Sequence, residues 1–275
     1  MPPSTPTRPL VLLFDIGGVC VGSPLQAILD YETAHGIPPG WINQSIAQSG
    51  PQGAWQRLER GEIPLDAAFH AAWKRDLADA QRWRAHWVRH LARLHGESSA
   101  PAAPDNVPPV PDIDTRRLHA AMIAASRSVD PHMGAALRRL RRHADRHPGA
   151  LVLGALSNTV IVPGGESDGG GTQRLDARVF DVFVSSAHVG LRKPEPEVYR
   201  FAVARVGEFV RAKGWGGAGV RAQDVVFLDD IGANLKPARS MGMRTIKVGL
   251  GKTNVAVAEL EAITGLGLAD EPSRL

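Results

Sequence analysis

Carboxylates follow two short apolar runs, one near each end of the chain. Residues 10–14 lead into Asp15, and residues 225–228 lead into the adjacent pair Asp229 and Asp230. Runs of this length and composition are typical of buried parallel strands. Ligands in open α/β sheets bind at the carboxyl ends of the strands. Acids gathered there can hold a cation or attack an electrophile, so the pattern predicts metal-assisted catalysis at one edge of a sheet.

Further polar groups stand at comparable places between these two runs. Ser157 and Asn158 follow the apolar run 150–156, and Lys193 precedes a helix that begins with proline. Each of these features alone is ordinary loop composition. Two adjacent carboxylates beside a sheet are harder to explain, because they repel each other unless a cation or a lysine is near.

Asp15 has the chemistry of a nucleophile for phosphoryl transfer. An aspartate that attacks phosphorus forms an aspartyl-phosphate, which divides one difficult displacement into two easier ones. Mg²⁺ prefers oxygen ligands, and Asp15, a backbone carbonyl and Asp230 can supply three of them.

The remaining polar residues complete such a site. The Ser157 hydroxyl and the Asn158 amide can donate hydrogen bonds to phosphoryl oxygens, and Lys193 adds a fixed positive charge against the charge of the transition state. Asp229 is expected to orient Lys193, and Asn234 to support the residues around the metal. The predicted substrate is therefore a small phosphorylated compound.

Three segments resemble the haloacid dehalogenase-like hydrolase superfamily, in which four motifs occur in this order and a cap is inserted after the first. The segments are 156–159, 191–199 and 227–239. Within the superfamily, the resemblance is closest to the N-terminal phosphatase domain of soluble epoxide hydrolase. It fades across residues 97–131 and 163–177.

The resemblance implies roles for the positions that match. It makes Asp15 the nucleophile and Mg²⁺ the cofactor. The metal would be held by Asp15, the carbonyl of Gly17 and Asp230. The phosphate would be bound by Ser157, Asn158 and Lys193.

The chain departs from the superfamily at Gly17. The usual motif is Asp-x-Asp, whose second aspartate protonates the leaving alcohol and later activates water. Glycine keeps the backbone carbonyl but removes this acid and base, which costs about 10² to 10⁴ in rate. A water, or a residue of the cap such as His35 or Glu59, could take its place. Substrates with good leaving groups, such as acyl phosphates or sugar-1-phosphates, would suffer least.

Two other functions remain open. In a haloacid dehalogenase the aspartate attacks carbon and the halide leaves without a proton, which fits Gly17. The retained pair Asp229 and Asp230 argues against it, because that reaction needs no metal. A catalytically weak or inactive pseudo-phosphatase could instead use the same pocket and a Trp-rich cap to bind a partner. Every other motif is intact, and Mg²⁺-dependent activity would separate an enzyme from a binding protein.

Strands alternating with helices predict an α/β fold with a doubly wound, parallel, Rossmann-like sheet. The expected core consists of residues 1–22 plus 130–275, and residues 23–129 form an inserted helical cap. Five of the six tryptophans fall in this insertion, and Trp83 and Trp87 share one helix face that is expected to pack in a core. The expected strands are 10–14, 150–156, 179–184, 225–228 and 244–248. The expected helices outside the first part of the cap are 115–125, 131–147, 195–213, 231–241 and 253–263.

Composition places the 275-residue chain among soluble globular proteins, with 43% hydrophobic and 22% charged residues. The net charge is +4, but Lys and Arg are dispersed, and the densest group, 138–142, suits a solvated helix face. We therefore expect no nucleic-acid binding. No apolar stretch is long enough to cross a bilayer. The oligomeric state and the identity of the substrate cannot be read from the sequence.

Two features bear on the compartment. Cys20 is the single cysteine, which excludes an intramolecular disulfide and favours a reducing compartment. Its place after the first strand favours a small core residue over a nucleophile. The last three residues, Ser273, Arg274 and Leu275, resemble the Ser-Lys-Leu peroxisomal signal. The expected location is thus cytoplasmic, or peroxisomal if this tripeptide is used.

Overall fold

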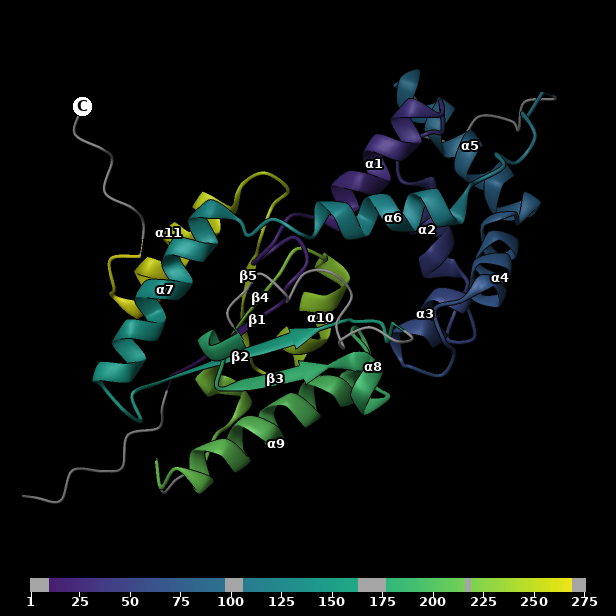
Figure 1. Cartoon of the computed structure of the whole chain (residues 1–275). Helices are drawn as coiled ribbons and strands as arrows, with labels where there is room; N and C mark the ends of the chain where they lie inside the picture. Colours follow the sequence, from purple (N-terminus) through teal and green to yellow (C-terminus); the bar gives the residue numbers. More distant parts are fainter. Residues whose placement is uncertain (1–9, 97–105, 163–176, 216–218, 269–275) are drawn as a thin grey trace, which may run out of the picture.

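Five parallel strands form a single sheet in the computed structural model, which describes residues 10–96, 106–162, 177–215 and 219–268 (Figure 1). Their order across the sheet is β3-β2-β1-β4-β5, so the chain starts in the centre and winds to both sides. This topology confirms the predicted doubly wound α/β fold. The strands are β1 Leu10–Phe14, β2 Leu151–Ser157, β3 Val182–Ser185, β4 Val225–Asp229 and β5 Arg244–Lys247.

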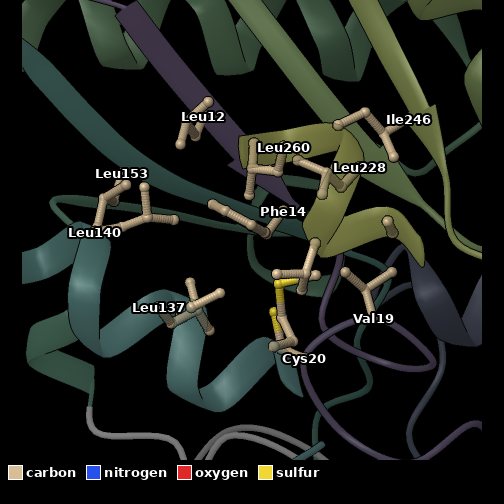
Figure 2. Close-up of a cluster of buried hydrophobic side chains, with 14 of the residues drawn as sticks. Leu12, Phe14, Val19, Cys20, Leu137, Leu140, Leu153, Leu228, Ile246 and Leu260 are labelled. Carbon is tan, nitrogen blue, oxygen red and sulfur yellow. The ribbon is translucent and has the colours of Figure 1, made fainter. Parts of the chain in front are cut away.

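Helices cover both faces of the sheet. The first face packs against α7 Pro131–Arg146 and α11 Thr253–Thr264, and the second against α9 Pro196–Ala212 and α10 Gly232–Ser240. Side chains alternate along β1, so Leu12 and Phe14 meet Leu137 and Leu260 on the first face (Figure 2). Val11 and Leu13 enter the cluster on the second face. Since both faces are buried, the central strands are continuous apolar runs.

Among the described residues, six helices lie beyond the ends of β2 and β3, on the side to which the strand arrows point (Figure 1). They have a hydrophobic core of their own, in which Trp41 and Trp73 are fully buried. Trp83 is also buried and its ring contacts Trp87, as predicted for this helix face. We call these helices the cap. They are α1 Pro24–Ala34, α2 Trp41–Gln48, α3 Ala54–Glu59, α4 Ala67–Leu77, α5 Ala80–Leu94 and α6 Thr115–Ala125.

The chain passes between core and cap twice, and the two passages lie side by side. Val21 forms an antiparallel bridge with Val129, and the Gly22 amide donates to the Ser128 carbonyl at 2.9 Å. Ser23 then caps α1, where its Oγ accepts from the backbone amide two residues on. These crossings lie at the predicted boundaries of a cap at 23–129, and that division remains a prediction.

The structure differs from the expected elements mainly around β3. That strand begins at Val182 rather than at residue 179, because Ala177–Val179 form the 3₁₀ turn η1. The Asp181 carboxylate accepts from the Leu153 amide at 2.9 Å and so joins the turn to β2. Two short elements were not expected: the one-turn helix α8 Ser186–Val189 and the 3₁₀ turn η2 Ala222–Asp224. The other predicted elements agree with the structure to within one or two residues.

Within the described residues, no helix combines the length and the apolar character that spanning a membrane requires. The C-terminal tripeptide 273–275 lies outside the described residues.

Candidate active site at the carboxyl edge of the sheet

Strand register brings the first two acids together. Phe14 on β1 pairs with Leu228 on β4, and the Asp15 amide donates to the Leu228 carbonyl at 2.8 Å. Asp15 and Asp229 therefore leave the two central strands at the same level. The Ile16 amide donates to Asp15 Oδ1 at 2.7 Å and fixes that carboxylate beside the strand end.

Lys193 joins these two carboxylates. Its Nζ lies 2.7 Å from Asp15 Oδ1 and 2.8 Å from Asp229 Oδ2, and its side chain is 1% exposed. Burial lowers the pKa of Lys193, but the charges of Asp15 and Asp229 outweigh it and leave that pKa above its ordinary value. Lys193 is thus a fixed positive charge at the carboxyl edge.

The carboxylate oxygens of Asp229 accept hydrogen bonds from neighbouring donors. Asn234 Nδ2 donates to Oδ1 and Oδ2 at 3.0 and 3.1 Å, and the Ile231 amide donates to Oδ1 at 2.7 Å. The Tyr199 hydroxyl holds the Asn234 carbonyl at 2.6 Å, which anchors the start of α10. With these donors on it, Asp229 is suited to orient Lys193, and Asn234 to support Asp229.

Asp230 lies against the loop after β1. Its Oδ2 accepts from Ser23 Oγ at 3.4 Å, so the first residue of the predicted cap touches this carboxylate. Gly18 has a φ of +74°, and a Cβ placed there would lie 2.1 Å from Asp230 Oδ2. Only glycine leaves room for this carboxylate.

The acidic cluster could hold a divalent cation. Asp15, Asp229 and Asp230 each offer an oxygen within 4.8 Å of the others. Burial raises the pKa of Asp15 to about 8 against the opposing charge of Lys193, and burial with the charge of Asp229 raises that of Asp230 to about 7. Two buried carboxylates and the partly buried Asp230 face one lysine, so a cation would relieve their repulsion. The all-oxygen donor set fits Mg²⁺.

Gly17 lies in the same loop, where a short bridge joins it to Val21. That bridge uses the Ile16 carbonyl, which accepts from Val21, and the Gly18 amide, which donates to Val21. The Gly17 carbonyl takes no part in it and so remains a possible metal ligand. An ideal Cβ on Gly17 would meet only Pro24, at 3.3 Å.

Ser157 and Asn158 lie at the same edge of the sheet, but their side chains make different contacts from those predicted. Ser157 ends β2, is buried, and has its Oγ 3.4 Å from the Asn158 carbonyl. The Asn158 side chain binds the backbone of Lys193: its Oδ1 accepts from the Lys193 amide at 2.9 Å, and its Nδ2 donates to the Lys193 carbonyl at 3.1 Å. The predicted donation from both side chains to a phosphoryl group remains a prediction.

Glu59 and His35, the two proposed substitutes for the missing acid, lie in different surroundings. Glu59 is buried at the end of α3 and ion-paired to Arg192, with Nη2 and Oε2 2.6 Å apart. His35 is exposed at the far end of α1, where its ring stacks on Tyr31. Sequence reasoning did not predict the role of Arg192, because its partner lies 133 residues away in the chain.

Cys20 is buried and its thiol donates to the Asp15 carbonyl at 3.1 Å. Burial, together with the charge of Asp15, raises the pKa of Cys20 well above its ordinary value. Both observations agree with a core residue rather than a nucleophile.

Comparisons with known structures identify the fold. A predicted HAD-like family hydrolase from Porphyromonas gingivalis superposes with a TM-score of 0.50 at 17% identity, covering 94% of this chain and 99% of that one. A dehalogenase superposes with a TM-score of 0.51 at 17% identity, covering 97% and 100%. The chain has a haloacid dehalogenase-like fold. At this level of identity the likeness concerns the fold and leaves the reaction open.

Two curated proteins are similar to this chain in sequence. Acyl-CoA dehydrogenase family member 10 of Mus musculus is 27% identical over 259 residues, which is 94% of this chain. Bifunctional epoxide hydrolase 2 of Rattus norvegicus is 43% identical over 93 residues, or 34% of this chain. The chain spans 19% and 14% of the lengths of these relatives. No protein-family model matches the chain.

Proposed function

We propose that this haloacid dehalogenase-like chain is an Mg²⁺-dependent phosphatase that hydrolyses a small organophosphate through an aspartyl-phosphate on Asp15. One observation supports the proposal above all others: Lys193 Nζ contacts Asp15 and Asp229 at once, beside the third carboxylate of Asp230. A nucleophile, a fixed cation and an excess of oxygen ligands together suit phosphoryl transfer.

In the proposed reaction an oxygen of the Asp15 carboxylate attacks phosphorus, and the bond from phosphorus to the leaving oxygen breaks. Water then hydrolyses the aspartyl-phosphate and regenerates Asp15. The contact with Lys193 favours the ionised form of Asp15, which burial opposes. Lys193 also lies where it can neutralise charge on the phosphoryl oxygens. Mg²⁺ bound by Asp15, the Gly17 carbonyl and Asp230 would supply further neutralising charge.

Gly17 narrows the proposed substrates. No carboxyl occupies the position from which the superfamily's second aspartate protonates the leaving group, and Glu59 is already paired with Arg192. Leaving groups that depart without a proton are therefore favoured. Acyl phosphates belong to this class, since their carboxylate leaves unprotonated.

A haloacid dehalogenase is the second candidate, because halide also leaves without a proton. Gly17 favours it, because the chain lacks the acid that would protonate an alcohol leaving group. The cluster of three carboxylates weighs against it, since attack on carbon does not need a metal there. Halide release from a 2-haloacid is the measurement that would support it.

The test of the proposed function is phosphate release from p-nitrophenyl phosphate and acetyl phosphate, with and without Mg²⁺. We expect Mg²⁺-dependent release that is lost in Asp15→Asn, a variant of nearly the same shape whose amide is a poor nucleophile. Circular dichroism of both proteins checks that the fold is retained. Release that persists in Asp15→Asn would refute the assignment of the nucleophile. No release by the wild type from either compound would favour a binding protein or dehalogenation.

A further inference from the structure

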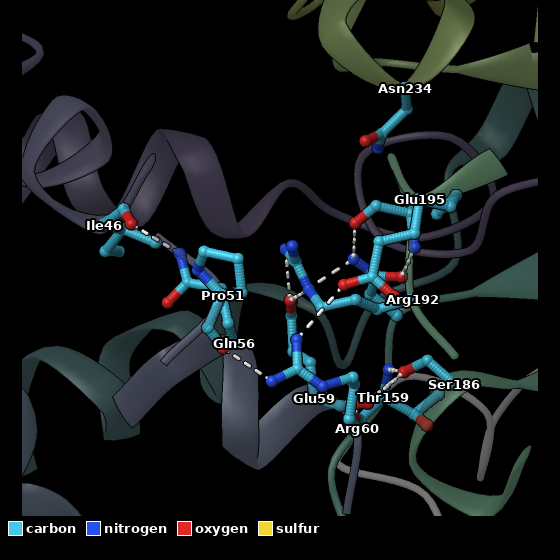
Figure 3. Close-up of polar contacts among 12 residues, drawn as sticks. Ile46, Pro51, Gln56, Glu59, Arg60, Thr159, Ser186, Arg192, Glu195 and Asn234 are labelled. Atoms are coloured by element: carbon cyan, nitrogen blue, oxygen red, sulfur yellow. Dashed lines mark hydrogen bonds and ion pairs between the residues drawn. The ribbon is translucent and has the colours of Figure 1, made fainter. Parts of the chain in front are cut away.

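The C-terminal end of α3 binds the segment of chain that holds Lys193. The Glu59 carboxylate accepts from Arg192 Nε and Nη2 at 2.7 and 2.6 Å (Figure 3). It also accepts from Asn158 Nδ2 at 3.3 Å. All three contacts fall on the same oxygen, Oε2. One cap carboxylate therefore ties together two core segments that lie far apart in the sequence.

Asn158 extends this contact to Lys193. Its Oδ1 and Nδ2 are bound to the backbone amide and carbonyl of Lys193. Arg192, the other partner of Glu59, is the residue immediately before Lys193. The backbone of Lys193 is thus held from two directions by groups that both contact Glu59.

Further contacts hold the C-terminal end of α3 against the core. The Ser186 hydroxyl on α8 donates to the Glu59 carbonyl at 2.6 Å, and Arg60 pairs with Glu195 at 3.1 Å. Gly61 has a φ of +67°, and a Cβ there would lie 2.2 Å from the Ala187 carbonyl oxygen. The backbone after α3 thus packs directly on α8, with no space for a side chain between them.

We propose that Glu59 is a positioning residue for Lys193. Through Arg192 and Asn158, this cap carboxylate holds the backbone of Lys193 where its Nζ reaches both Asp15 and Asp229. The cap then helps to build the catalytic geometry itself, in addition to covering the site. The kinetic consequence depends on the proposed phosphatase function, whereas the structural consequence does not.

Two observations favour a positioning role for Glu59 over that of an ordinary exposed ion pair. The side chains of Glu59 and Arg192 are only 11% and 15% exposed, so solvent screens their interaction weakly. The Lys193 side chain is almost completely buried, and its Nζ contacts both carboxylates at short distances. A backbone shift of about 1 Å would break such contacts and can cost 10²-fold in rate.

Hydrogen exchange of the Lys193 amide tests the inference without any catalytic activity. This amide donates to Asn158 Oδ1, so its protection reports on the restraint directly. We expect Glu59→Gln, which keeps the size but loses the charge, to speed exchange of this amide by about tenfold or more. Glu208→Gln is the matched control, because it removes a carboxylate from an exposed pair with Arg205 on α9. Unchanged exchange in folded Glu59→Gln would overturn the inference.

Kinetics with acetyl phosphate supply the second measurement. Glu59→Gln should lower kcat about 10- to 100-fold with little change in KM, and Arg192→Gln should do the same. The double variant should lose no more than Glu59→Gln alone, since that variant already breaks the Glu59–Arg192 ion pair. Additive losses would overturn the inference. If the wild type releases no phosphate, the proposed function fails while the exchange experiment still decides the role of Glu59.

Discussion

Restoring an acid at position 17 should raise phosphatase activity. In Gly17→Asp the new Cβ would lie 3.3 and 3.4 Å from Pro24 Cδ and Cγ, so the proline ring has to yield by only a few tenths of an ångström. Burial already raises the pKa of Asp15 to about 8 and that of Asp230 to about 7. A fourth carboxyl beside Asp15, Asp229 and Asp230 should therefore keep its proton near neutral pH and be available as a general acid.

The size of the gain should depend on the leaving group. Proton transfer by a positioned acid contributes about 10²- to 10⁴-fold. We expect kcat/KM for an alkyl phosphate, whose alkoxide needs a proton, to rise within this range. For acetyl phosphate kcat/KM should change by less than about tenfold, since acetate leaves unprotonated.

The assay compares phosphate release from glycerol phosphate and acetyl phosphate at saturating Mg²⁺. Gly17→Asn is the matched control, because it fills the same space without a transferable proton, and it should show no gain. An equal gain with both substrates would refute leaving-group protonation as the missing step. No gain with either, in a variant that still binds Mg²⁺, would mean that another group already supplies the proton.

Two further predictions concern metal binding and acid stability. Gly18→Ala should weaken Mg²⁺ binding, measured by calorimetry, because its Cβ would fall 2.1 Å from Asp230 Oδ2; unchanged affinity would exclude Asp230 as a ligand. Burial, followed by the charge of His70, lowers the pKa of His119 to about 4. The unfolded chain therefore binds more protons than the folded one between pH 6.5 and 4, and the free energy of unfolding should fall by ~2 kcal/mol from pH 7 to 5 on this account. Urea unfolding of His119→Gln should lack this part of the loss, and an identical pH dependence would contradict it.

The sequence was most informative where burial and conformation coincide. Runs such as Leu10–Phe14 and Val225–Asp229 are strands because both faces of the sheet are covered, so their apolar composition reports their position directly. Around β3, apolar composition does not indicate strand conformation. Val179 and Phe180 pack against the core cluster although they precede the strand, so an apolar pair there indicated burial but not strand conformation. The single turn of α8 is too short for any helical period to show.

The sequence by itself determined which groups reach the carboxyl edge. Apolar runs that end in Asp15 and Asp229 become parallel strands whose ends must meet at one edge, so the nature of the site followed from local pattern. Only the tertiary structure decided how these groups are held. The Asn158 side chain binds the Lys193 backbone, and Glu59 reaches across from the cap to Arg192. Such contacts join residues up to 133 positions apart, and they depend on where packing sets α3 against α8, which no local pattern records.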